Sequence, residues 1–565
     1  MAVDLVGGGP AADAVRAALA DVDVATTDTD LDGLEADLAV VVGEPGDGTF
    51  HSMNDAALAS GRRWIAVELG GIGGYGVVDA AVAGFGPSTA CYECLSGRVA
   101  ANLESEPDAA STARAETARF AGAIAGRAAA RTVSDGPANI FGAVVEVPHA
   151  NRTLLPLPEC SCAEEAVSPL SLRAVDRSVE ASLARAERAL DDRVGIVTEV
   201  GEAESLPAPY YLARACDTAG FSDTTAARDA AGVAGDWDTA FMKALGEAME
   251  RYAAGVYRLD DLVTGPPGAI DGAVWPGAFV VRDDPENESI RWVDGLDLHT
   301  EKPVKLPAEF VHYPPATEQF RPSITTGLGL GNGGCGAVLA GLYEVVERDA
   351  AVLAWYSTFE PLGLEVDDEA YAGLVARARA ADLEVSPLLL TQDVDVPVVG
   401  VAVHRETWPR LALGTAANLD PAAAARSALA EALQNWMELR GMGPAGAESA
   451  SGAIGHYADF PDAVRSFVEP GAAVPASSVG PDVVPTGRDE LTAVLERIDD
   501  VGLTAHAAST TTRDLRELGF RAVRVLVPGA QPLFFGEPYF GDRAREVPTT
   551  LGFESELDRD HHPFP

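Results

Sequence analysis

Residues 342–356 read LYEVVERDAAVLAWY, a stretch that combines paired carboxylates with a strongly apolar setting. Glu344 and Glu347 are three residues apart, so on a helix they share one face, with their side chains about 5 to 6 Å apart at the base. Apolar side chains fill most of the neighbouring positions: Leu342, Val345, Val346, Leu353 and Trp355. The pattern predicts a largely buried helix, in which the carboxylates need partners.

A shorter copy of this pattern, KALGEAMERY, occupies residues 243–252 and places Glu247 and Glu250 at the same spacing. Magnesium prefers a few carboxylates together with water and phosphate oxygens, so two such pairs facing one another would make a nucleotide-phosphate site without a glycine-rich P-loop. For a single E-x-x-E the alternative is a solvated helix face. The apolar neighbours of Glu344 and Glu347 favour the metal site.

Two further segments could contribute to such a site. TTGLGLGNGGCG, residues 325–336, leads directly into the second glutamate helix, and its bare backbone could hold phosphate at the helix N-terminus, although a glycine-rich surface loop looks the same. GTAANLDPAAAARSALAEALQNW, residues 414–436, predicts a helix that begins near Pro421 and places Glu431 and Gln434 three residues apart. An amphipathic helix with exposed polar positions explains that spacing equally well.

The composition indicates a globular protein and excludes some partners. The chain has 565 residues, 47% of them apolar, so two or three domains are expected. Its 86 acidic and 41 basic residues give a formal net charge of −45, which would repel nucleic acids and anionic membrane surfaces. Only three residues are lysine, and this scarcity beside abundant Asp and Glu is typical of a halophilic cytosol, where salt screens self-repulsion. Without a signal-peptide or membrane-span pattern, we expect a cytoplasmic location.

The order of the predicted elements favours the α/β class. The apolar runs AVDLV, LAVVV and IAVEL alternate with helical stretches, which predicts a small Rossmann-like parallel sheet in the first domain. A charged helix over about 170–191 would connect it to a large second α/β domain, with long helices around 238–254, 336–356 and 422–439. The predicted divisions are a first domain over 1–165, a connector over 166–192 and a second domain over 193–565.

In their order, GEAMER, GLGLGN with LYEVVERDAAVLAW, and GTAANLDPAAAARSALAEALQ resemble the motifs of the YcaO family. The similarity covers about 193–565 and includes VRVLVPG at 523–529. The resemblance implies ATP binding with Mg2+ held by the glutamates, and contacts to the nucleotide by an asparagine and an arginine. The residues so implied are Glu247, Glu250, Glu344 and Glu347 for magnesium, and Asn332 and Arg348 for the nucleotide.

The resemblance also implies a reaction. Family members phosphorylate a backbone amide oxygen of a peptide, and a Cys, Ser or Thr side chain then attacks the activated amide to form an azoline. We expect this cyclodehydration, as in the SagD-like branch of bacteriocin biosynthesis, with a ribosomally made precursor peptide as substrate. A thioamide formed with a sulfur donor is the alternative. The resemblance leaves two questions open: whether a sulfur-transfer or leader-binding protein is a partner, and whether the chain forms a homodimer.

Three departures from the family pattern leave a non-catalytic nucleotide-binding scaffold as a further alternative. Gly336 stands where a glutamate is usual, and the upstream Gly-Lys-Gly is replaced by Gly232, Val233 and Ala234. Lys243 stands where a serine is common. One turn from Glu247, this lysine could supply the lost positive charge and act in catalysis, or form a simple Lys–Glu helix pair.

The C-terminus supplies a second predicted catalytic residue. The peptide-modifying branch often ends in P-x-P-x-P with its tail reaching the active site, and the last two prolines of that pattern are present as Pro563 and Pro565. The resemblance therefore implies that Pro565 reaches the site, whereas the alternative is a frayed terminus.

Residues of about 38–100 resemble the ubiquitin-activating-like (ThiF-like) proteins fused to such enzymes, with CYEC at 91–94 as the core of the match. Those proteins pair a C-x-x-C with a later cysteine pair to hold structural Zn2+. Here the resemblance assigns Cys91, Cys94, Cys160 and Cys162 to zinc, although LPLPECSC has a tighter C-x-C. The glycines at 7–9 partly match a dinucleotide fingerprint, but we expect no nucleotide in this peptide-docking domain.

Overall fold

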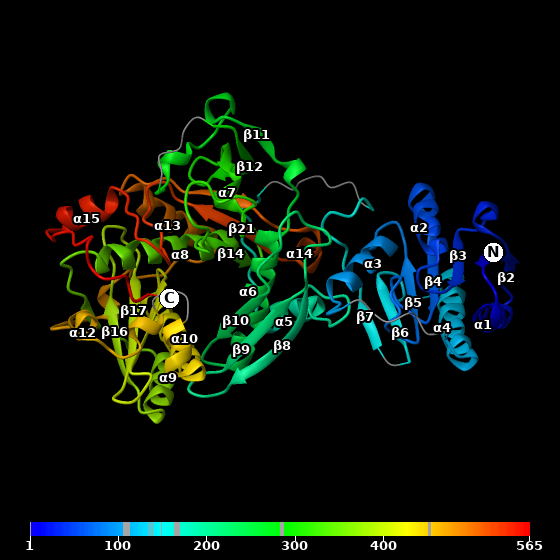
Figure 1. Cartoon of the computed structure of the whole chain (residues 1–565), viewed down its shortest axis with the longest axis horizontal. Helices are drawn as coiled ribbons and strands as arrows, with labels where there is room; N and C mark the ends of the chain where they lie inside the picture. The colour runs from blue at the N-terminus through cyan, green and yellow to red at the C-terminus, as the bar shows by residue number, and fades with distance from the viewer. Residues whose placement is uncertain are drawn as a thin grey trace. The chain divides into compact units, whose positions relative to one another are not determined.

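The computed structural model describes residues 2–105, 113–134, 136, 139–148, 150–162, 170–282, 288–449 and 454–564. The chain forms two compact units (Figure 1). The first consists of Met1–Val167, Glu187–Glu199 and Ala215–Ser222, and the second of Ser168–Ala186, Val200–Arg214 and Asp223–Pro565. Within the described ranges, no helix has both the length and the apolar character needed to span a bilayer.

The first unit, blue to cyan in Figure 1, is built on a seven-stranded sheet with the order β2-β1-β3-β4-β5-β6-β7. The first four of these strands are parallel and the remaining pairings are antiparallel. The strands are β1 (Ala2–Val6), β2 (Ala25–Asp28), β3 (Leu38–Gly43), β4 (Arg63–Leu69), β5 (Ala80–Phe85), β6 (Ala143–Val147) and β7 (Ala150–Thr153). The helices are α1 (Gly9–Ala20), α2 (Gly48–Ser60), α3 (Tyr92–Ala101) and α4 (Ala115–Val133).

The predicted parallel strands are present, and four more complete the sheet. AVDLV, LAVVV and IAVEL form β1, β3 and β4. Four strands were not predicted: β2, β5, β6 and β7. The ATTD of β2 is largely exposed and lacks an apolar pattern. β5 is a continuous apolar run that periodicity alone cannot distinguish from a buried helical segment.

The second unit contains most of three further sheets. Their orders are β10-β9-β8, then β11-β12-β20-β21-β14 with β13 paired to β12, and β18-β17-β16-β15-β19. The first two sheets contain β8 (Val197–Glu204), β9 (Tyr210–Ala215), β10 (Asp229–Val233), β11 (Val263–Gly265), β12 (Ile290–Asp297), β13 (Pro303–Pro307), β14 (Leu328–Gly331), β20 (His506–Ser509) and β21 (Arg521–Leu526). The third contains β15 (Leu362–Glu365), β16 (Glu384–Leu389), β17 (Val398–His404), β18 (Leu411–Ala417) and β19 (Ala473–Pro475).

The helices of this unit include the three that the sequence predicts: two have nearly the expected bounds, and the third, expected over 422–439, extends to Ser449. They are α5 (Val179–Ala186), α6 (Trp237–Gly255), α7 (Ala308–Val311), α8 (Gly334–Trp355), α9 (Glu369–Ala380), α10 (Pro421–Ser449, interrupted at Gly443), α11 (Ile454–Tyr457), α12 (Asp462–Val468), α13 (Arg488–Asp499), α14 (Arg513–Leu518) and α15 (Arg543–Leu551). The helix expected over 170–191 is reduced to α5. Residues just before it pack against the glycine turn at the start of α8, where a Cβ at Gly334 would lie 2.0 Å from the oxygen of Ser171.

Three strands of the second unit lie directly against the three long helices: β10 on α6, β14 on α8 and β18 on α10. In each pair a strand glycine permits the approach, because a side chain there would collide with the helix backbone. A Cβ would lie 2.2 Å from Ala244 N at Gly232, 2.2 Å from Ala337 O at Gly329, and 2.4 Å from Ala428 O at Gly414. The long helices are thus members of a repeated strand–helix pair.

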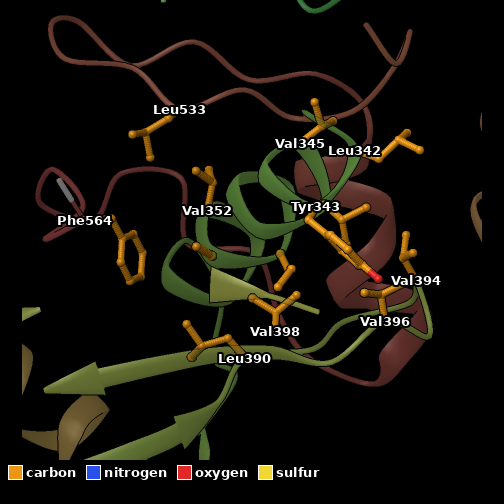
Figure 2. Packing of buried hydrophobic residues seen from close by; sticks show 14 of the residues in the cluster. Leu342, Tyr343, Val345, Val352, Leu390, Val394, Val396, Val398, Leu533 and Phe564 are labelled. Carbon is orange, nitrogen blue, oxygen red and sulfur yellow. The ribbon is translucent and has the colours of Figure 1, made fainter. Parts of the chain in front are cut away.

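α8 runs through the largest hydrophobic cluster of this unit. Figure 2 shows Val352 of α8 facing Leu533 and Phe564 from the C-terminal part of the chain, and Tyr343 reaching toward Val396. The buried helix predicted from LYEVVERDAAVLAWY is confirmed, since most of its side chains are buried.

Candidate functional site

Each long helix carries a glutamate whose carboxylate accepts a hydrogen bond from the backbone at its paired strand. The donor precedes the acceptor by 16 or 17 residues in every case. The pairs are Ala231 N–H with Glu247 Oε2 (2.7 Å), Gly327 N–H with Glu344 Oε2 (3.0 Å) and Thr415 N–H with Glu431 Oε2 (2.6 Å). The repeated strand–helix pair therefore places one carboxylate at the same position three times.

The carboxylates of the three helices affect one another's protonation. Burial, and then the charges of Glu344 and Glu247, raise the pKa of Glu250 to about 8. Burial, Glu431 and Glu344 raise the pKa of Glu347 to about 7. Burial with the charge of Glu344 also raises the pKa of Glu247 and of Glu431. The charge of Glu344 thus acts on carboxylates of α6, α8 and α10. We call the five residues the carboxylate cluster: Glu247, Glu250, Glu344, Glu347 and Glu431.

Two arginines lie within this cluster. Arg348 Nη1 is 3.4 Å from Glu347 Oε1, and its Nη2 is 3.7 Å from Glu431 Oε1. Arg251 Nη2 donates to Glu247 Oε1 at 2.5 Å. The charges of Arg524 and Lys243 also act on the cluster, on Glu250 and Glu431 respectively.

The donor set of the cluster fits magnesium. Carboxylate oxygens are ligands that Mg2+ prefers. The pKa of Glu250 is raised to about 8 by burial and by neighbouring negative charge, so a divalent cation beside it would favour the ionised form that this environment opposes. The residues predicted as magnesium ligands, Glu247, Glu250, Glu344 and Glu347, therefore lie within electrostatic range of one another and of Glu431.

A cavity of about 520 Å3 opens beside α6, a size typical of small-molecule sites. Its walls include Glu247, Glu250, Lys243 and Asn332. The amide of Asn332 is held by α5 and the residues before it: Nδ2 donates to the Ser182 hydroxyl at 2.9 Å, and Oδ1 accepts from Arg177 at 3.4 Å. The predicted nucleotide-contacting asparagine therefore faces the same cavity as the α6 carboxylates.

Sequence reasoning missed Ser182, Arg177 and Thr415. Ser182 and Arg177 also line the cavity. The hydroxyl of Thr415 donates a hydrogen bond to Glu347 at 2.6 Å, and the backbone N–H of Thr415 donates one to Glu431. Their contacts join segments up to 155 residues apart in the chain, so no local spacing reveals them.

At the N-terminus of α8, a backbone N–H that could bind phosphate already has a hydrogen-bond acceptor. The Cys335 N–H donates to Arg173 O at 3.3 Å, and a Cβ at Gly333 would lie 2.6 Å from the same oxygen. The segment before α5 thus covers this helix end. Gly331 and Asn332, immediately before it, line the cavity instead.

Lys243 lies in α6, and Gly336 lies in the first turn of α8. The Lys243 residue is exposed, but the protein around its ammonium group lowers its pKa by partial desolvation, opposed mainly by the charge of Glu431 and then by that of Asp236. In the described part of the chain it forms no ion pair with Glu247. A Cβ at Gly336 would meet nothing within 4 Å, so this position has room for a side chain.

The four predicted zinc ligands come together in the first unit. Cys91 Sγ lies 3.8 Å from Cys94 Sγ and 3.5 Å from Cys160 Sγ, and Cys94 Sγ lies 3.6 Å from Cys162 Sγ. All four sulfur atoms lie within 4.8 Å of one another. The tight C-x-C therefore does not prevent a four-thiolate arrangement, which fits tetrahedral zinc.

The C-terminal segment is anchored against the end of α8. The Trp355 ring nitrogen donates to Asp560 O at 2.8 Å, and the His562 N–H donates to the Tyr356 hydroxyl at 3.2 Å. Burial, His561 and then Arg348 lower the pKa of His562 to about 3, so the segment lies within electrostatic reach of the carboxylate cluster. Pro565 itself lies outside the described residues.

The family model described as YcaO cyclodehydratase, ATP- and Mg2+-binding, matches residues 231–531, more than half of the chain. An uncharacterized protein of Methanothermobacter thermautotrophicus is 29% identical over 335 residues, which are 54% of this chain and 81% of that protein.

Two solved structures share the fold of nearly the whole chain. One, described as a heterocyclase in complex with substrate and cofactor, has a TM-score of 0.76 at 20% identity and covers 98% of this chain and 83% of that one. The heterocyclase TruD has a TM-score of 0.69 at 19% identity, with coverage of 98% and 82%. At these identities the likeness establishes the α/β fold of both units, as predicted.

Proposed function

This chain belongs to the YcaO family, and from that premise we propose that it phosphorylates a backbone amide oxygen of a peptide and closes the activated amide to an azoline. Membership makes it an ATP-dependent enzyme of the cyclodehydratase type that binds ATP and Mg2+. The observation that supports the peptide reaction best is the electrostatic coupling of partly buried carboxylates from α6, α8 and α10 beside a cavity.

The residues divide into two groups in this proposal. Glu247, Glu250, Glu344 and Glu347 would hold magnesium, which offsets negative charge on the transferring phosphoryl group. Arg348 and Asn332 would contact the nucleotide. Ser182 and Arg177 are positioning residues, because they fix the amide of Asn332 toward the cavity.

The proposed reaction balances as follows. The amide oxygen attacks the γ-phosphorus of ATP, and ADP leaves. The thiol or hydroxyl of a neighbouring Cys, Ser or Thr then adds to the amide carbon, and phosphate leaves with the former amide oxygen. The peptide loses one water overall, and the side-chain and amide protons pass to acceptors at the site.

Lys243 is the proposed source of positive charge in the cavity, because it lines the same wall as Glu247 and Glu250. Pro565 keeps its proposed place at the end of a tail that is anchored on α8. We also propose that the first unit is a ThiF-like peptide-docking domain with structural zinc on Cys91, Cys94, Cys160 and Cys162, and that the domains divide near 165 and 193.

Glu344→Gln tests the proposal, with Glu369→Gln on the exposed start of α9 as matched control. Calorimetry with ATP and Mg2+ should show affinity reduced roughly a hundredfold for Glu344→Gln, because one cation ligand loses its charge, and no change for the control. Equal binding by both variants and the wild type would exclude the carboxylate cluster as the metal–nucleotide site.

Mass analysis of peptides incubated with the protein, ATP and Mg2+ identifies the product. Loss of one water is expected for an azoline. Replacement of oxygen by sulfur in the presence of a sulfur donor would instead identify a thioamide-forming enzyme. Tight ATP binding without turnover across many peptides would identify a non-catalytic scaffold, which the glycine at 336 favours.

A further inference from the structure

A second cavity, of about 420 Å3, lies in the same unit between the end of α6 and the β11–β12 ribbon. None of the magnesium or nucleotide residues lines it. Its walls combine aromatic and aliphatic side chains with polar and charged ones in nearly equal measure, and they include Tyr257, Thr264, Arg291, Glu309, His312 and Phe320. We call it the aromatic cavity.

The aromatic side chains of this cavity are held in fixed positions. The rings of Tyr257 and His312 stack with their centroids 3.7 Å apart and an interplanar angle of 15°. The Tyr257 hydroxyl donates to Pro314 O at 3.1 Å. The Phe320 N–H donates to the carboxylate of Glu309 at 2.8 Å, which fixes the loop that forms another wall. The cavity is therefore pre-formed, which lowers the entropic cost of binding.

The chemistry of the walls suits an aromatic ring that carries a hydrogen-bond donor. Burial lowers the pKa of His312 to about 4, so its ring is neutral near pH 7 and has one acceptor nitrogen. Arg291 supplies a guanidinium group whose charge reaches Tyr257. Stacked rings, proline faces and a guanidinium group all interact favourably with an aromatic face.

The aromatic cavity is close to the carboxylate cluster. Glu250 lies five residues before the last residue of α6, Gly255, and Tyr257 follows that residue by two, so the Cα atoms of Glu250 and Tyr257 are at most about 15 Å apart. The charge of Arg524 acts on the pKa of both His312 and Glu250. An extended chain covers about 15 Å with about five residues.

We infer that the aromatic cavity binds a tyrosine or tryptophan side chain of the peptide substrate, a few residues from the amide that is modified at the carboxylate cluster. The inference rests on the proposed function for its substrate class. β11 is the edge strand of its sheet, and Thr264 on it lines the cavity, so an extended peptide can pair with the strand while its side chain enters.

The test uses the full-length protein without ATP and two substitutions on β11. Thr264→Trp fills the cavity from its wall. Val263→Trp is the matched control, because adjacent strand residues point to opposite faces and Val263 is 44% exposed and does not line the cavity. Both variants keep residues that favour strands. Circular dichroism and thermal unfolding verify the fold of each.

The probes are N-acetyl-tryptophanamide and N-acetyl-tyrosinamide, with N-acetyl-leucinamide for comparison, and binding is measured by saturation-transfer NMR titration. Wild type and Val263→Trp should bind both aromatic probes with equal affinity, and Thr264→Trp at least about tenfold more weakly. The leucine probe should bind more weakly to the wild type than either aromatic probe.

Equal aromatic binding by wild type and Thr264→Trp would overturn the inference, as would equal weakening in both variants or equal affinity for the leucine probe. The ATP and Mg2+ affinity of Thr264→Trp should match the wild type. Since the probe titration needs no nucleotide, its outcome is separate from that of the Glu344→Gln test of the proposed function.

Discussion

The carboxyl group of Glu250 has its pKa raised from an ordinary value of 4.5 to about 8, because burial and two neighbouring carboxylates disfavour its charged form. Between these two values the folded chain holds a proton on Glu250 that the unfolded chain has released. Stability must then fall as pH rises across this range, since the native state binds more protons. Glu347, with a pKa of about 7, acts in the same direction.

We therefore expect the thermal midpoint of metal-free protein, at constant high salt, to decrease from about pH 5 to about pH 8. Added Mg2+ should raise the midpoint most at about pH 8, where cations compete with the fewest protons. Differential scanning calorimetry across this range measures both effects. Glu250→Gln serves as the control, because it removes one titrating group and should flatten the slope.

A midpoint that rises with pH in the absence of metal would contradict the expectation, as would an unchanged slope in Glu250→Gln. At this scale the sequence identifies the residues but not their chemistry. The pairs Glu247 with Glu250 and Glu344 with Glu347 follow from helical spacing, whereas their raised pKa values depend on charges from other helices.

At the scale of elements, the three strand–helix pairs explain why so many glycines precede the carboxylates. Gly232, Gly329 and Gly414 allow their strands to approach the helix backbone, which brings each strand amide within hydrogen-bond distance of a glutamate. Gly336 has no such neighbour. Glycines near the site therefore have different tolerances to substitution.

Gly232→Ala and Gly336→Ala each add one methyl group and should have opposite effects. At Gly232 the new Cβ would collide with the backbone of α6, so the free energy of unfolding should fall by about 1–3 kcal/mol. At Gly336, in the first turn of α8, alanine should raise it by about 0.5–1 kcal/mol. Urea denaturation followed by circular dichroism measures both changes, and equal effects would refute the strand–helix contact.

The cysteine cluster joins the N-terminus of α3 to residues about seventy positions later. If it holds structural zinc, the purified protein should contain about one zinc per chain, and Cys91→Ser should lose the metal and lower the thermal midpoint. Cys216→Ala, also in the first unit, is the control and should keep the metal. Elemental analysis decides the point, and metal retained in Cys91→Ser would exclude this ligand set.

For the whole molecule, the net charge of −45 should be the main determinant of its response to salt. Raising KCl from about 0.1 M to about 1 M shortens the Debye length from about 10 Å to about 3 Å, so repulsion between surface carboxylates weakens. The thermal midpoint should rise by several degrees. Choline chloride at equal ionic strength is the control and should give a similar rise, and a midpoint that is constant or falls would contradict the halophilic interpretation.

The α/β class, the long glutamate helices and the pairing of carboxylates were accessible from sequence because they depend on local rules. Apolar periodicity predicted α8 as a buried helix, and E-x-x-E spacing predicted a shared face for Glu344 and Glu347. Four strands of the first sheet were missed: an exposed edge strand such as β2 leaves no apolar pattern, and a continuous apolar run such as β5 cannot be distinguished from a buried helical segment by periodicity.

The sequence alone determined which residues carry the charge and which helices carry those residues, since helical spacing acts over three or four positions. Only the tertiary structure decided that the carboxylates of α6, α8 and α10 act on one another's protonation, that Thr415 and Arg348 both contact Glu347 and Glu431, and that α5 fixes Asn332. The physical reason is range: these contacts join strands and helices up to 155 residues apart, and burial and Coulomb interactions depend on distance in space rather than along the chain.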